Sequence, residues 1–359
     1  MLNFSVGPVQ SSEAVLAIGA EQVPYFRTVE FSETMLENER LIKKFAYTTN
    51  DSRVVFMTCS GSGGMETAIM NTLTKEDKAL IINGGSFGQR FVELLTLHGI
   101  PYSEIKLEYG KALKEEHLKP FEGKGYTAFL LQKLETSTGV LFDMNLVSEF
   151  CKRNKSFLIV DAISTFLADP FDMEELNVGI MITSSQKALA CPPGVSVICL
   201  APSALKRVER TKCCCMYFDL KLALDNQIRG QTPWTPAVSI LRQINVRLKE
   251  IDELGGAKAV IKKTAHLAAY FRNKLKEYEL PFEIVTESLS NAVTPLHPTT
   301  QSAYKIFLKI KDEYGMWICP NGGEMKDSIF RVGHIGCLTE ADYDNLIHAF
   351  LDLQNKNFI

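Results

Sequence analysis

Short apolar runs alternate with helical segments along the first two thirds of this 359-residue chain, and this pattern limits the possible folds most strongly. The runs are RVVFM, KALII, AFLLQ, SFLIVD, VGIMITS and GVSVICL. Because a strand that is apolar on successive residues must be buried on both faces, such runs are typical of a mostly parallel sheet covered by helices. We therefore predict an α/β architecture for this part of the chain.

The pattern changes near residue 240. A long helical segment from Val238 to Tyr278 is interrupted at Gly255 and Gly256. Short candidate strands follow, FEIVTES, AYKIFLKI and IFRVGHIG, and then a last helical segment, EADYDNLIHAFLDLQNK. This mixture predicts a smaller α+β domain. We predict an N-terminal segment near the functional site at 1–15, a large domain at 16–240 and a small C-terminal domain at 241–359.

Charge, hydropathy and cysteine usage argue against several classes of protein. A formal net charge of -3 gives no basic excess of the kind that nucleic-acid binding requires. No apolar run reaches the roughly 18 residues that span a bilayer, and the N-terminus lacks a secretory pattern. The nine cysteines show no C-x-x-C spacing, which argues against a disulfide framework and a zinc site. We therefore expect no metal, no membrane or nucleic-acid partner, reduced thiols and a cytoplasmic location. The role of the Cys213–Cys215 run stays open.

Polar residues at the ends of the predicted strands mark a candidate site. In an open parallel sheet, ligands bind beyond the carboxyl ends of the strands. The turn Ser60–Gly64 lies between a strand and a helix, where backbone amides can hold an anion. Asp161 ends one apolar run, and Lys187 follows the next. Taken singly, each has an ordinary explanation: a tight glycine turn, a helix cap, and an amine that reaches solvent.

Taken together, these features predict a site for pyridoxal 5′-phosphate. A lysine amine can condense with the aldehyde of this cofactor. A carboxylate can keep the pyridine nitrogen protonated, and a glycine turn can hold the phosphate. The chain also resembles the class V aminotransferases of pyridoxal-phosphate fold type I, most of all the alanine–glyoxylate and serine–pyruvate enzymes. The resemblance runs from FSVGPV to IFRVGHIG, and VDAIS followed by SSQKALACPPG is its most specific part.

The resemblance implies the fold and the site residues. The fold would be that of fold type I pyridoxal-phosphate transferases, with a mostly parallel sheet flanked by helices and a smaller α+β C-terminal domain. Lys187 would be the catalytic lysine that carries the cofactor and moves the proton, and Asp161 would bind the pyridine nitrogen. Arg331 would grip the substrate α-carboxylate, with Gly7 as a second substrate contact. The other cofactor contacts would be Ser62, Gly63, Gly64, Phe87, Thr136, Gln186 and Thr235.

The resemblance also implies a homodimer with shared active sites, because Thr235 lies in TPWTPAVSI, where one subunit contacts the phosphate of the other. Some positions depart from the family pattern. Gly64 stands where histidine or threonine is common, Phe87 where tryptophan is common, and Lys133 where histidine is usual. Since stacking needs only a flat face, the change at Phe87 is mild.

The implied reaction moves an amino group from a small amino acid, alanine or serine first, to glyoxylate or pyruvate by a ping-pong mechanism. A 2-aminoethylphosphonate–pyruvate enzyme, which commonly has asparagine where His334 stands, and an aspartate donor remain alternatives. A cysteine desulfurase or lyase usually has histidine before its lysine, where this chain has Gln186. A non-catalytic relative would need no arginine that binds a substrate, so the presence of Arg331 argues against this alternative. The sequence leaves the donor, acceptor, pathway and assembly beyond a dimer undecided.

Overall fold

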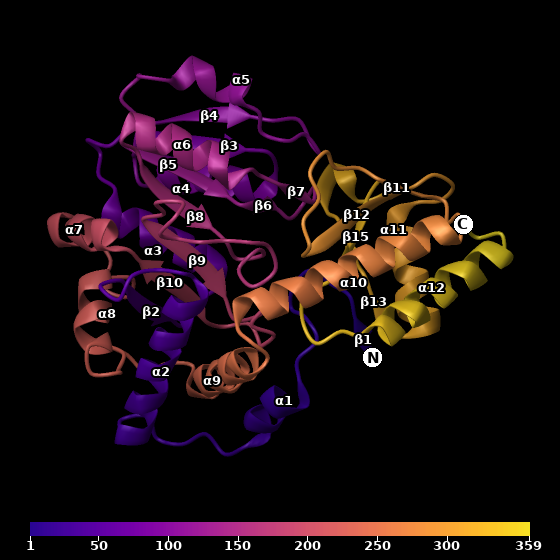
Figure 1. The fold of residues 1–359 in the computed structure, drawn as a ribbon, viewed down its shortest axis with the longest axis horizontal. Helices are drawn as coiled ribbons and strands as arrows, with labels where there is room; N and C mark the ends of the chain where they lie inside the picture. Colours follow the sequence, from indigo (N-terminus) through magenta and orange to yellow (C-terminus); the bar gives the residue numbers. More distant parts are fainter.

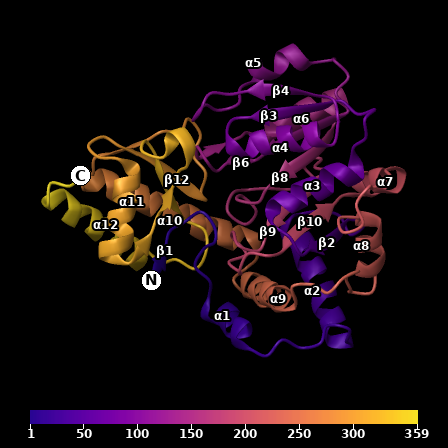
Figure 2. The ribbon, with the colours of Figure 1, turned by 180° about the vertical axis from the view of Figure 1, so that it is seen from behind.

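A long helix joins two bodies of unequal size in the computed structural model, which describes residues 1–359 (Figure 1). Helix α10, Ala257–Glu277, runs from beside the large body into the small one. Both ends of the chain lie on the side of the small body in the two opposite views (Figure 2). No helix has the length and apolarity that a bilayer crossing requires.

The large body contains a seven-stranded sheet of order β2-β10-β9-β8-β5-β3-β4. All neighbouring pairs are parallel except the two that β10 makes. This arrangement confirms the predicted mostly parallel sheet. The edge strand β4 escaped the sequence reading because its polar residues break the continuous apolar pattern. The strands are β2 Arg53–Met57, β3 Ala79–Asn83, β4 Tyr102–Lys106, β5 Ala128–Gln132, β8 Phe157–Asp161, β9 Ile180–Ser184 and β10 Ser196–Leu200.

Helices cover both faces of this sheet. Along β3, Leu80 and Ile82 join one apolar cluster, whereas Ala79 and Ile81 join another. The first cluster includes residues of α2, α6 and α9, and the second includes residues of α3, α4, α7 and α8. Burial on both faces is the reason that the strands read as continuous apolar runs. The helices are α1 Glu13–Ala20, α2 Val29–Phe45, α3 Gly61–Thr72, α4 Ser86–Leu97, α5 Glu115–Leu118, α6 Met144–Asn154, α7 Pro202–Arg210, α8 Leu220–Gln227 and α9 Val238–Glu253; the short pair β6 Leu134–Glu135 and β7 Val140–Leu141 follows β5.

The small body is a four-stranded sheet of order β11-β12-β15-β14 with helices packed against it. The N-terminal strand β1, Leu2–Asn3, pairs in parallel with β13, so the start of the chain belongs to this body. A third apolar cluster unites the sheet with the helices. The elements are β11 Phe282–Ile284, β12 Val293–Pro298, α11 Ala303–Tyr314, β13 Met316–Trp317, β14 Cys319–Pro320, β15 Phe330–Gly333 and α12 Glu340–Asn355.

The prediction of a strand at AYKIFLKI is wrong, because this segment forms helix α11. The hydroxyl of Ser302 caps the helix by accepting from the Lys305 amide. The aromatic and β-branched content of AYKIFLKI resembles that of a strand, but the apolar residues of the segment recur with helical spacing and are buried on one face. These residues are Ala303, Ile306, Phe307 and Ile310.

The packing of α9 and α10 bears on the boundary between the bodies. Apolar residues of α9 and of the first turns of α10, including Val260, belong to the first apolar cluster, which also contains Leu80 and Ile82 of the large sheet. The later part of α10, from Leu267, joins the cluster of the small body. The division at residue 240 stays a prediction, and we propose that the boundary falls within α10.

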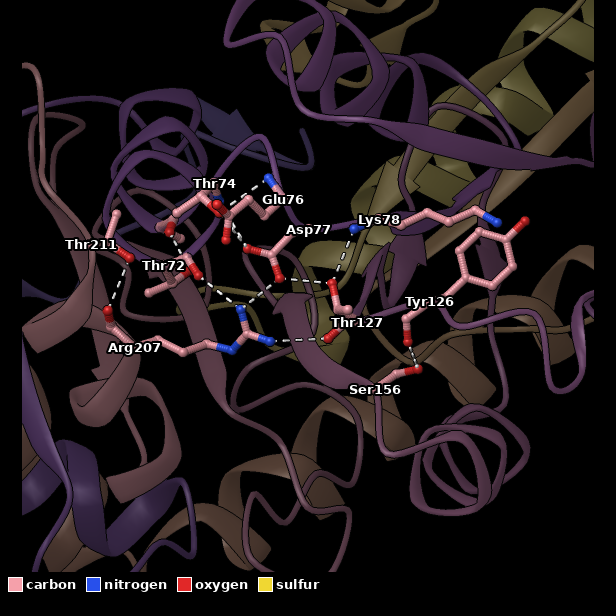
Figure 3. A network of polar contacts seen from close by, with 11 residues as sticks. Thr72, Thr74, Glu76, Asp77, Lys78, Tyr126, Thr127, Ser156, Arg207 and Thr211 are labelled. Atoms are coloured by element: carbon pink, nitrogen blue, oxygen red, sulfur yellow. Dashed lines mark hydrogen bonds and ion pairs between the residues drawn. The ribbon is translucent and has the colours of Figure 1, made fainter.

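A polar network lies at the amino-terminal end of the parallel strands of the large sheet (Figure 3). Arg207 of α7 donates to the carbonyls of Thr72, at 3.0 Å, and Thr127, at 3.1 Å. It also pairs with Asp77 at 3.1 Å, and Asp77 accepts a 2.7 Å hydrogen bond from the Thr127 hydroxyl. These groups bind one another just before β3 and β5 begin. The network is therefore structural, and the predicted site residues lie at the opposite, carboxyl ends of the strands.

Candidate active site

The fold brings the three predicted features to one edge of the large sheet. Asp161 is the last residue of β8, and Lys187 follows the end of the adjacent strand β9. The turn Ser60–Gly64 follows β2 and opens α3. Since β2, β8 and β9 all run in the same direction, their carboxyl ends meet at this edge.

Lys187 is buried, with 8% of its surface exposed. Its Nζ donates a 2.6 Å hydrogen bond to the carbonyl of Val6. Burial lowers the pKa of this amine to about 8, while the nearby Cys319 thiol and the Asp161 carboxylate oppose the shift and Arg331 adds to it. A pKa of about 8 leaves about a tenth of the amine neutral at pH 7, and this is the form that acts as a nucleophile or base.

Asp161 is also buried, and burial raises the pKa of its carboxyl to about 7. The Ile163 amide donates to its Oδ1 at 2.8 Å, and the positive charge of Lys187 also favours the ionised form. A buried carboxylate with so few donors gains from a cationic partner. A protonated ring nitrogen is a partner of this kind.

The start of α3 offers donors for an anion. The N-cap residue Ser60 makes no side-chain cap, so the first amides of this helix have no partner within the helix. The Ser184 hydroxyl is buried without a hydrogen bond, and a Cβ added to Gly61 would lie 2.8 Å from it. An unpaired buried hydroxyl beside a helix N-terminus suits a phosphate group.

Packing explains why Gly64 departs from the family pattern. A Cβ at this position would lie 2.0 Å from Ser196 Oγ and 3.0 Å from Ile182. A Cβ at Gly63 would lie 2.9 Å from Cys59 Sγ. The turn thus lies directly against β9 and β10, and no histidine or threonine fits at residue 64 without rearrangement.

A second helix start lies beside this turn. Phe87, half-buried, is in the first turn of α4. Arg90, on the same face of this helix, lies 5.5 Å from the Phe87 ring and donates to the Ser62 hydroxyl at 2.8 Å. Sequence reasoning missed Arg90, because its contact with Ser62 joins two helix starts that are distant in the sequence.

Arg331 of β15 reaches from the small body to the large one. Its Nη1 donates to the carbonyl of Thr136 at 2.9 Å and its Nη2 to the carbonyl of Pro320 at 2.8 Å. Its Nε is buried and has no partner. The Thr136 hydroxyl bonds to Ser164 at 2.9 Å. The guanidinium is thus held in place with a donor to spare, which suits the binding of a carboxylate.

The remaining predicted residues differ in how they relate to this cluster. A Cβ at Gly7 would lie 2.9 Å from Lys187 Nζ, so the N-terminal segment covers the amine. Gln186 is half-buried and makes no side-chain hydrogen bond. Thr235 is exposed, lines a small cavity with Thr58 and Tyr217, and has no hydrogen bond to the cluster within the chain.

The amine of Lys133 makes its contacts elsewhere, although the Lys133 backbone amide donates to the carbonyl of Asp161 at 2.9 Å. The Lys133 Nζ donates to the carbonyl of Pro170 and lies 5.2 Å from the centre of the Phe171 ring. Burial lowers the pKa of this amine also to about 8, with Asp169 opposing the shift. Because Lys133 lines a separate cavity of about 530 Å³ with Pro170 and Phe171, its amine is not part of the cluster around Lys187.

Comparison with known proteins identifies the family. The family model of class-V aminotransferases matches residues 23–302. The chain is 27% identical to the soluble hydrogenase 42 kDa subunit of Anabaena cylindrica, over 98% of this chain and 94% of that protein. It is 29% identical to the L-aspartate–glyoxylate aminotransferase of Paracoccus denitrificans, over 84% of this chain and 77% of that protein.

The fold agrees with this match. The crystal structure of a subgroup IV aspartate aminotransferase from Thermus thermophilus superposes with a TM-score of 0.91, at 24% identity, over 99% of each chain. The family match covers most of this chain and includes both Asp161 and Lys187. The chain therefore belongs to the class-V aminotransferases of fold type I and is an aminotransferase.

Proposed function

We propose that this aminotransferase uses pyridoxal 5′-phosphate to move the amino group of a small amino acid, alanine or serine first, to a 2-oxo acid such as glyoxylate or pyruvate. One observation carries the proposal: a buried amine, a buried carboxylate and an uncapped helix N-terminus meet at the carboxyl edge of the sheet. The Paracoccus relative, named for glyoxylate transamination, supports the choice of acceptor.

The chain's own residues would hold each part of the cofactor. When bound, pyridoxal 5′-phosphate supplies an electron-withdrawing ring that makes the Cα–H of an attached amino acid acidic. Asp161 would accept a hydrogen bond from the ring nitrogen. The donors for the phosphate would be the first amides of α3, with Ser62, Gly63 and Gly64, and the Ser184 hydroxyl. Phe87 would stack on the ring, and the Thr136 hydroxyl and Gln186 would complete the contacts.

Lys187 and Arg331 would act on the substrate. With its pKa lowered to about 8, the Lys187 amine can accept a proton from the substrate Cα and return one to the cofactor side. Arg331 would bind the α-carboxylate through the fork of its guanidinium, which orients the Cα–H toward Lys187. Gly7 leaves room for this approach, because any side chain there would meet the amine.

Aspartate is a second candidate donor, which the name of the Paracoccus relative favours. A 2-aminoethylphosphonate donor, a cysteine desulfurase or lyase activity, and a non-catalytic role remain less favoured. Gln186 before the lysine speaks against sulfur chemistry, and Arg331, held with a free donor, speaks against a mere binding protein.

A half-reaction screen tests the proposal. Purified protein loaded with pyridoxal 5′-phosphate is mixed with one amino acid at a time, and the visible absorbance of the cofactor is followed. We expect alanine or serine, without any oxo acid, to convert the cofactor to its amine form, and glyoxylate to restore it. If no amino acid produces this change, the proposal is wrong. If only aspartate or 2-aminoethylphosphonate does so, the donor is misassigned.

We also propose a homodimer with shared sites, since Thr235 is exposed and lies outside its own cluster. Large apolar side chains at 50% exposure or more on α1, on the segment that follows it and at the start of α2 support a covered face: Leu16, Val23, Tyr25 and Val29. Sedimentation should give twice the chain mass of 40.2 kDa.

Mixing inactive Lys187→Ala and Thr235→Ala subunits tests whether the active sites are shared. Recovered activity in the mixture supports shared sites, and a monomeric protein contradicts them. The cytoplasmic location stays a prediction.

A further inference from the structure

Glu135 is a buried carboxylate for which the proposed mechanism has no role. It lies at the end of the short strand β6 and has no exposed surface. Its carboxylate accepts from the amide of Phe87 at 3.2 Å and from that of Gly88 at 3.1 Å. These are amides of the first turn of α4, whose N-cap residue, Gly85, has no side chain to cap them. Glu135 therefore caps this helix from a distant part of the chain.

The same carboxylate fixes the turn that follows it. It accepts from the amide of Ser137 at 3.2 Å and from the Ser137 hydroxyl at 2.5 Å. It also accepts from Gln132 Nε2 at 2.9 Å. Burial raises the pKa of the Glu135 carboxyl, whereas the hydrogen bonds that it accepts from Ser137 and from the amides of Gly88 and Phe87 favour its ionised form.

Two side chains of the small body donate hydrogen bonds to the turn at 135–138. Arg331 donates to the carbonyl of Thr136, and Asn321 Nδ2 donates to the carbonyl of Ser137 at 2.9 Å. Glu135 thus stands between the helix start that carries Phe87 and the backbone that holds Arg331. A shift of this one carboxylate would move the proposed stacking ring and the proposed carboxylate anchor together.

We propose that Glu135 is a positioning residue that couples the cofactor-stacking end of α4 to the Arg331 anchor through a single buried carboxylate. This inference rests on the proposed function of the site. It assigns Glu135 no contact with substrate: its effect is transmitted through Phe87, Ser137 and Arg331. Its loss should therefore weaken both cofactor and substrate binding, which loss of either group alone would not do.

The variant Glu135→Gln tests this coupling, because it keeps the shape and replaces one acceptor oxygen by an amino group that faces donors. We expect the dissociation constant of pyridoxal 5′-phosphate and the KM for the amino acid each to rise about tenfold. The visible circular dichroism of the bound cofactor should change, since it reports how the ring is held. Glu135→Asp, which keeps the charge, should recover part of both losses.

Asp143→Asn is the matched control. Asp143 caps α6 by accepting from the amides of Asn145 and Leu146, so this variant also removes a carboxylate cap. It should leave all three readouts unchanged. If Glu135→Gln behaves like the wild type, or if Asp143→Asn shows the same losses, the inference is wrong.

Two further outcomes keep the tests separate. If Glu135→Gln does not fold, Ser137→Ala, which removes one donor and keeps the charge, should raise the KM more than it weakens cofactor binding; an unchanged KM would contradict the inference. If the wild-type protein takes up no pyridoxal 5′-phosphate, the proposed function itself fails. A working wild type with an unaffected Glu135→Gln overturns only the positioning role.

Discussion

Lys187→Ala should lower kcat for amino transfer by at least about 10⁴-fold, since both the covalent hold on the cofactor and the proton carrier are lost. The fold should survive, because removing a buried amine also removes a desolvation cost. Steady-state kinetics and urea unfolding measure the two effects. The unfolding midpoint should stay at or above that of the wild type.

Lys133→Met is the matched control for this variant. Lys133 is the other buried lysine whose pKa burial lowers to about 8, yet it faces Pro170 and Phe171 rather than the cluster. Its replacement should leave kcat within about threefold of the wild type, because the lost contacts are structural. Full activity of Lys187→Ala, or an equal loss in Lys133→Met, would contradict the assignment of the catalytic amine.

Arg331→Ala should lower kcat/KM for alanine by about 10²- to 10³-fold, the effect of leaving a substrate carboxylate without its charged, two-pronged partner. Arg331→Lys should recover little of this loss, because an ammonium lacks the planar fork that bonds to two carboxylate oxygens. The loss should appear mainly in the KM for amino acids and oxo acids.

An amine donor without an α-carboxylate provides the control for Arg331. Its much slower reaction should change little between the wild type and Arg331→Ala, because it has no group for the guanidinium to bind. If the variant processes alanine normally, the anchor is misassigned. If both kinds of donor lose activity equally, Arg331 acts on the fold of the site rather than on the carboxylate.

Much of the large body could be predicted from the sequence because burial on both faces leaves continuous apolar strands. Residues at strand ends, such as Asp161 and Lys187, follow from the same pattern, since parallel strands bring their carboxyl ends to one edge. The misread segment AYKIFLKI shows the limit of composition: aromatic and β-branched content suggested a strand, and only the spacing of its apolar residues indicated a helix.

The rest of the site depends on contacts between segments that are distant in sequence. Arg90 meets Ser62, Glu135 caps a helix that begins near residue 86, and the Ser184 hydroxyl lies unpaired beside Gly61. No local pattern reports such contacts, because the register between strand ends and loops is set only when the sheet assembles. Gly64 is a further case: the neighbouring Ser196 excludes a side chain, and the sequence does not show that neighbour.

The most direct test of the account is to treat the protein loaded with pyridoxal 5′-phosphate with borohydride and map the modified peptide by mass spectrometry. The account predicts one reduced cofactor per chain, attached to Lys187 and absent from Lys187→Ala. Attachment chiefly to Lys133 or to another lysine, or no attachment at all, would contradict it.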